Sequence, residues 1–160
     1  MRIRHITAAA AVLLLAAAAG CGLTGGQVGR YATQMPLTAS EYTIMVNKEI
    51  ALVMNLLETH MSNGRNVIRG RYPASDEAGN AEHSIVMTQE AISSVDSLYP
   101  AKGYEDDRLD TLRRMENALN SLENYLETLE HGDYEILDGL ISIMQGDYVA
   151  LKGMFSITWE

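Results

Sequence analysis

The chain has 160 residues, with 12 lysines and arginines against 21 aspartates and glutamates. This acidic excess opposes binding to nucleic acid, whose phosphates attract basic surfaces. A chain of this length suits one folded domain better than two.

The first twenty residues have the layout of a secretory signal. Arg2 and Arg4 form a basic head, and an apolar run of fourteen residues extends from Ile6 to Ala19. Such a run is too short for an ordinary membrane-spanning helix. We therefore expect residues 1–20 to be removed as a signal peptide.

The four residues Ala18, Ala19, Gly20 and Cys21 resemble the lipobox of bacterial lipoproteins. The resemblance implies that Cys21 receives a diacylglyceryl group, that a dedicated peptidase cuts before it, and that a fatty acid such as palmitate acylates the new amino terminus. Two or three such chains make membrane anchoring durable. Members of this family usually have leucine where this chain has Ala18.

An ordinary secretory signal, cut after Ala19, is the alternative. Cys21 is the single cysteine, so the exported protein has no internal disulfide to form, which favours the lipid interpretation. In lipoproteins of double-membrane bacteria an aspartate after the cysteine commonly marks retention at the inner membrane. Gly22 stands there instead, which allows residence in the outer membrane.

A lipidated flexible tether is expected over residues 21–37 and a helical domain over 38–160. Residues 22–29 are rich in glycine, which is typical of flexible linkers. Without Arg2 and Arg4 the mature chain carries 10 basic and 21 acidic residues, a formal charge of −11.

Four helices are predicted in the remainder, because apolar residues recur at intervals of three and four. The first begins at a capping box formed by Thr38 and Glu41 and runs to Tyr72 and Pro73. Its buried face is expected to hold Tyr42, Val46, Ile50, Val53, Leu57 and Met61.

The second helix is predicted to start at or after Ser75 and to end at Pro100. Its expected seam is Ala81, Ile85, Thr88, Ile92, Val95 and Tyr99. The third is predicted to end at Gly132, and its seam is Leu112, Met115, Leu119, Leu122, Leu126 and Leu129. The fourth follows Asp133, with Leu137, Leu140, Ile141, Met144, Leu151 and Met154 on one apolar arc. Short turns between four such helices predict an all-α, up-down-up-down four-helix bundle.

The fourth helix also contains a repeat of 14 residues, in which 132–145 aligns with 146–159. Three glycines of this helix, Gly139, Gly146 and Gly153, fall opposite its apolar arc and are expected to face outward. An interior glycine costs about 0.8 to 1 kcal/mol against alanine. One interpretation is a shallow stripe where another helix docks, made of Gly139, Ser142, Gly146, Gly153 and Ser156. The other is a locally flexible helix that the strongly buried opposite face tolerates.

Residues that would carry catalysis or bind a cofactor are scarce in this sequence. Glu127 and His131 lie four residues apart, a spacing that suits two metal ligands but more often marks a surface pair. A weak site that joins His60 and His131 at one end of the bundle is a further alternative. No serine, cysteine or glycine-rich pattern of known catalytic motifs occurs. We therefore expect no enzyme and assign no catalytic, cofactor or metal residue.

The sequence thus predicts a lipoprotein exported to the cell surface or to the periplasmic face of the envelope, where the lipid on Cys21 is its membrane anchor. Its expected role is that of a structural or adaptor protein, which acts through helix contacts with a second copy or another envelope protein. The alternative is a bundle that holds a small ligand or a metal ion between its helices.

Overall fold

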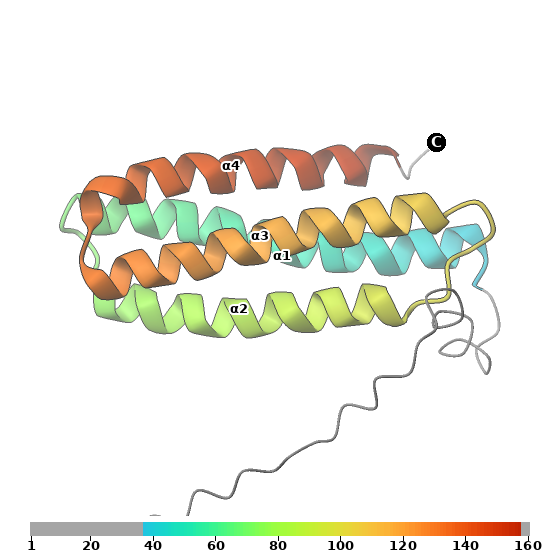
Figure 1. Cartoon of the computed structure of the whole chain (residues 1–160), viewed down its shortest axis with the longest axis horizontal. Helices are drawn as coiled ribbons and strands as arrows, with labels where there is room; N and C mark the ends of the chain where they lie inside the picture. Colours follow the sequence, from blue (N-terminus) through green and yellow to red (C-terminus); the bar gives the residue numbers. More distant parts are fainter. Residues whose placement is uncertain (1–36, 158–160) are drawn as a thin grey trace, which may run out of the picture.

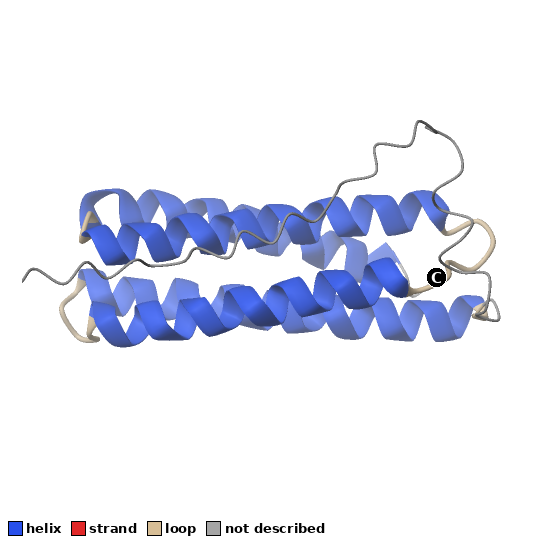
Figure 2. Cartoon of the chain, turned by 60° about the horizontal axis from the view of Figure 1, so that its bottom comes forward, coloured by secondary structure: helices blue, strands red, loops and turns tan. Residues whose placement is uncertain are grey.

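The computed structural model describes residues 37–157, which fold into four helices. These are α1 (Ala39–Ile68), α2 (Ala74–Ser97), α3 (Glu105–His131) and α4 (Tyr134–Ile157). They lie side by side and alternate in direction, and the described part of the chain contains no strand (Figures 1 and 2). The predicted all-α four-helix bundle is confirmed. The predicted signal peptide, Cys21 and nearly all of the tether lie outside the described residues.

The helices form a closed ring around one core. Each helix packs along the next one in the chain, and α1 also packs along α4. The start of α1, the turn between α2 and α3 and the end of α4 lie at one end, which we call the N-terminal end (Figure 1). The other two turns lie at the opposite end, which we call the far end.

Two helix ends have the capping interactions that the sequence predicted, at the start of α1 and at the end of α3. The Thr38 hydroxyl accepts a hydrogen bond from the Glu41 amide at 3.2 Å, and the Glu41 carboxylate accepts one from the Thr38 amide at 3.0 Å. This pair is the predicted capping box of α1. Gly132 follows α3 in the left-handed conformation, with φ of 71°, which glycine adopts at little cost.

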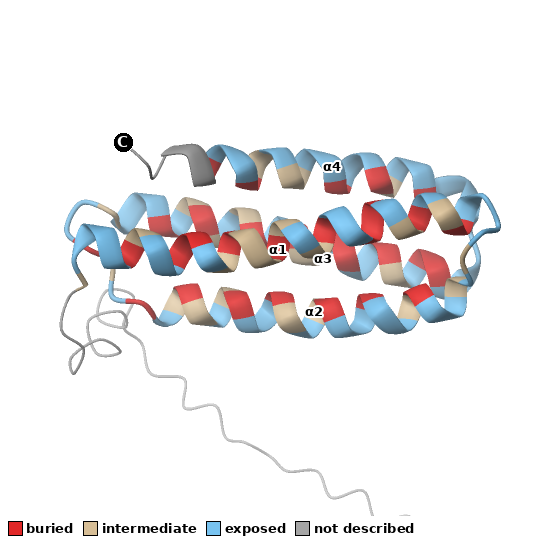
Figure 3. Ribbon diagram, turned by 180° about the vertical axis from the view of Figure 1, so that it is seen from behind, coloured by how far each residue is buried: buried red, intermediate tan, exposed pale blue. Residues whose placement is uncertain are grey.

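The buried residues of α1 and α4 agree with the predicted positions, except that Leu140 is only half-buried. All six predicted positions of α1 are at most 4% exposed. On α4 the buried side chains include Leu137, Ile141, Met144, Leu151 and Met154. Figure 3 shows this pattern as one buried stripe along each helix, with exposed residues on the outside.

The most buried residues of α3 agree with the predicted leucine seam at three of its six positions. At the other three, the buried residue is the one just before the predicted leucine. Leu112, Leu119 and Leu126 are only half-buried. The positions at the centre of the interface are Thr111, Ala118 and Tyr125. A bundle helix contacts two neighbours, so its buried arc is wide, and large leucines cover the flanks while smaller or polar residues face inward.

The second helix shows the same deviation. Ile85 and Ile92 are half-buried, and Tyr99 is exposed beyond the helix end. Ala81, Thr88 and Val95 are buried as predicted, and the other buried positions of α2 are Glu77, Ser84 and Ala91.

Candidate functional site

Five polar side chains meet inside the far half of the bundle, and we call them the polar cluster. His60 on α1 and Glu77 on α2 are 1% and 0% exposed, and His60 Nδ1 lies 2.6 Å from Glu77 Oε1. The Tyr125 hydroxyl on α3 donates a hydrogen bond to the same oxygen at 3.0 Å. Asn63 donates to Glu77 Oε2 at 2.7 Å, and Ser84 Oγ lies 2.8 Å from His60 Nε2.

The carboxyl group of Glu77 is at the centre of the cluster, because three nitrogen or hydroxyl groups surround its two oxygens. No side-chain atom of the polar cluster is buried without a partner. The cluster therefore uses its hydrogen bonds to join three helices.

A glycine on α1 makes room for the tyrosine of the cluster. Gly64 is buried, and a Cβ at this position would lie 2.8 Å from the Tyr125 hydroxyl and 3.0 Å from Ile141 Cδ1. The backbone carbonyl oxygen of His60 lies 3.1 Å from the Tyr125 hydroxyl and is a second acceptor for the same proton. Tyr125 thus lies directly against the backbone of α1, which a larger residue at position 64 would prevent.

Burial raises the pKa of the Tyr125 hydroxyl above its ordinary value, and the negative charge of Glu77 raises this pKa further. Ionised tyrosine beside a carboxylate would place two negative charges in the core. Tyr125 therefore acts as a hydrogen-bond donor and not as a base.

The sequence predicted His60 only as part of a weak metal site and did not predict its pairing with Glu77. Two signals pointed to the cluster. Gly64 continues the buried register of α1, where a glycine indicates close approach of a neighbouring side chain. Glu77 lies four and seven residues before Ala81 and Ser84, in the register of the buried face of α2.

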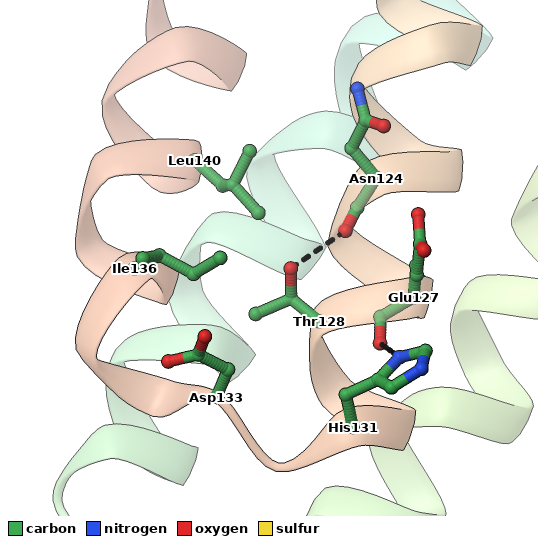
Figure 4. A pocket seen from close by; sticks show the side chains of 7 residues that line it. All are labelled: Asn124, Glu127, Thr128, His131, Asp133, Ile136 and Leu140. Atoms are coloured by element: carbon green, nitrogen blue, oxygen red, sulfur yellow. Dashed lines mark hydrogen bonds between the residues drawn. The ribbon is translucent and has the colours of Figure 1, made fainter.

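An open groove of about 450 Å³ lies between the end of α3 and the start of α4 (Figure 4). Its lining consists of Asn124, Glu127, Thr128, His131, Asp133, Ile136 and Leu140. His131 Nδ1 donates a hydrogen bond to the backbone carbonyl of Glu127 at 2.7 Å. The two residues that the sequence suggested as a pair are therefore joined through the backbone of Glu127. Within residues 37–157 no group of three or more His, Cys, Asp or Glu side chains is placed to hold a metal ion.

The outward face of α4 carries no charge over two heptads. Gly139, Gly146 and Gly153 are exposed, and a Cβ on any of them would meet no atom within 4 Å. Between them, Ile143 and Val149 expose 55% and 58% of their surfaces. With the exposed Ser142 and half-buried Ala150, these residues form what we call the α4 outer face: Gly139, Ser142, Ile143, Gly146, Val149, Ala150 and Gly153.

The docking stripe expected from the sequence corresponds to this face. Gly139, Ser142, Gly146 and Gly153 share the exposed side of α4, as predicted. Ser142 donates its hydroxyl to the backbone carbonyl of Asp138 at 3.0 Å. The side chain of Ser156 and the whole of Cys21 lie outside the part that can be described. Ile143 and Val149, the two large apolar residues of the face, were not part of the predicted stripe.

Comparisons of the chain with known protein families, with curated proteins and with solved structures found no match. Among the helices of the described range, none is both long enough and apolar enough to cross a membrane.

Proposed function

We propose that the protein is a lipid-anchored component of the bacterial cell envelope that acts by binding another protein through the α4 outer face. The observation that carries this proposal is the exposure of Ile143 and Val149 beside three glycines, on a face without charge. Ile44 on α1 and Leu109 on α3 are also exposed, by 64% and 53%, but neither of these helices has an exposed glycine. A contiguous exposed apolar surface is typical of a protein contact.

Support for the anchor comes from the sequence alone. Residues 18–20 and Cys21 resemble a lipobox, and the mature chain is strongly acidic, so its surface would not hold it to anionic lipids. Acyl chains on Cys21 would bind the protein to the bilayer while the bundle remains in water. No catalytic step enters this proposal.

The anchor is tested by intact mass and fractionation of the full chain from its native cells. We expect a protein that begins at Cys21, carries the mass of two or three acyl chains and sediments with membranes. The Cys21→Ser variant should lose the acyl mass and leave the membrane fraction. An unmodified residue 21, or a retained leader, would contradict the anchor.

The contact surface is tested by a charge placed on α4, in the full chain. Ile143→Asp should abolish complexes that cross-linking captures in cells with the unsubstituted protein. Val86→Asp is the matched control, because Val86 is 49% exposed on α2 and lies off the proposed surface. Equal loss, or equal retention, in both variants would contradict a contact through α4.

A second candidate function is the binding of a small polar ligand in the groove between α3 and α4. The groove favours it, because His131 and Asp133 line one part and the apolar Ile136 and Leu140 line another. Elemental analysis and native mass spectrometry of the purified protein distinguish the two. A stoichiometric ligand or metal supports the groove, and an oligomer or a bound protein supports the outer face.

A further inference from the structure

The α4 outer face has the same kind of residue at equal distances before and after Gly146. Three residues away stand Ile143 and Val149, both large, apolar and more than half exposed. Four residues away stand the small Ser142 and Ala150, and seven residues away stand Gly139 and Gly153. The surface is therefore nearly symmetric about its centre.

Such symmetry has a specific structural meaning. A two-fold axis perpendicular to a helix pairs residues before the centre on one copy with residues after the centre on the other. With the axis at Gly146, each Gly139 would face Gly153 of the other copy, and Ile143 would lie at the same height as the other copy's Val149, on the opposite edge of the contact. Glycines allow two backbones to approach closely, and the aliphatic side chains between them fill the remaining space.

The charges beside the face agree with this arrangement. Asp138 and Lys152 are both exposed and flank the face on the same side, eight residues before and six after Gly146. The two-fold axis brings equal flanks together, so Lys152 would lie within about 3 Å of the other copy's Asp138 along the helix axes. A parallel pair would separate the same residues by about 21 Å.

The absence of charge also favours this face over the rest of the surface as the contact between two copies. The mature chain carries a formal charge of −11, so most contacts between two copies are repulsive. The outer face carries no charge, and two antiparallel α4 helices also oppose their dipoles favourably.

We propose that two copies of this protein bind each other through the α4 outer face, as an antiparallel helix pair centred on Gly146. This inference rests on the proposed function in one respect, since both assign the contact to the same face. It adds the partner, the direction of the helices and their register.

Single cysteines in the full chain, with its own leader, test the register. An exposed glycine tolerates a new side chain, since nothing lies within 4 Å of positions 139, 146 and 153. Under an added oxidant, Gly146→Cys should form a disulfide-linked dimer. Gly139→Cys and Gly153→Cys should each fail alone, because like residues are then about 21 Å apart. Cells that express both of these variants together should again yield the dimer.

The controls are the unsubstituted chain and Gly79→Cys. Gly79 is an exposed helical glycine on α2 with open space around it, so it reports random collision. Dimer from Gly139→Cys or Gly153→Cys alone would overturn the antiparallel pair. A Gly146→Cys yield no higher than that of Gly79→Cys would overturn the contact between copies. If Ile143→Asp still abolishes captured complexes in that case, the proposed function stands and only this inference fails.

The flanking charges provide an independent test in the Gly146→Cys background. Lys152→Asp should reduce the dimer yield about twofold or more, because two acidic residues then face each other. Adding Asp138→Lys should restore the yield. A loss that persists in the double variant, or no loss at all, would overturn the proposed register.

Discussion

Two regions of this bundle reverse the usual distribution of polar and apolar residues. The polar cluster places His60, Glu77 and Tyr125 in the core, and the α4 outer face exposes Ile143 and Val149 to solvent. The two regions differ in whether their unusual residues have contacts within the bundle. Every buried polar atom of the cluster has a partner within the bundle, whereas nothing within the described residues covers the open positions of the outer face. The cluster is therefore explained by the fold, and the outer face is where we propose that a partner binds.

The largest effect is expected at the carboxylate of the cluster. Glu77→Ala removes the acceptor of Asn63 and the partner of His60 Nδ1 from the bundle, and the Tyr125 hydroxyl keeps only the backbone carbonyl of His60. This should lower the free energy of unfolding by about 3 kcal/mol. Denaturation in urea measures the change. Glu82→Ala on the same helix is exposed and should change it by no more than about 0.5 kcal/mol. Equal effects of the two variants would mean that the cluster contributes nothing to stability.

The second effect has the opposite sign and concerns the outer face. Replacement of Gly139, Gly146 and Gly153 by alanine should raise the free energy of unfolding by about 2 to 3 kcal/mol, because alanine favours helix and meets no atom there. Gly79→Ala on α2 should raise it by about 0.8 to 1 kcal/mol. The triple variant should also associate less. A more stable protein with unchanged association would show that the glycines serve no contact.

The same substitution inside the bundle should destabilise it. Gly64→Ala adds a methyl group 2.8 Å from the Tyr125 hydroxyl and 3.0 Å from Ile141. Overpacking of this kind costs about 1 to 3 kcal/mol, which exceeds the gain in helix propensity. Thermal unfolding next to the Gly139→Ala single variant gives the comparison. A stabilised Gly64→Ala variant would show that Tyr125 moves away freely.

The smallest effect appears only in alkaline solution. The pKa of Tyr125 is raised in the folded protein, so above about pH 10 the unfolded chain loses this proton first. Stability from Tyr125 is complete below that pH and falls by about 1 kcal/mol between pH 10 and 11. Tyr125→Phe should show a shallower decline over this interval. The same slope in both proteins would contradict a buried hydroxyl held by Glu77.

Apolar periodicity predicted the bundle, because a helix that buries Val53 and Leu57 must repeat its apolar residues every three or four positions. It predicted the outward direction of Gly146 for the same reason. It misplaced Leu119, since periodicity does not show which part of a wide buried arc faces the centre. It missed the cluster. Glu77 lies in the register of the buried face of α2, but a pattern of apolar residues does not show that His60 on another helix is its partner.

The position of the two helix ends constrains how anchored copies would sit at a membrane. The start of α1 and the end of α4 lie at the same end of the bundle (Figure 1). In an antiparallel pair the two α1 helices would therefore begin at opposite ends, about 45 Å apart for a helix as long as α1. Such a dimer would either rest lengthwise on a single leaflet or form a bridge between two facing bilayers. Upright, side-by-side insertion in one bilayer would require one tether to extend along the whole length of the bundle.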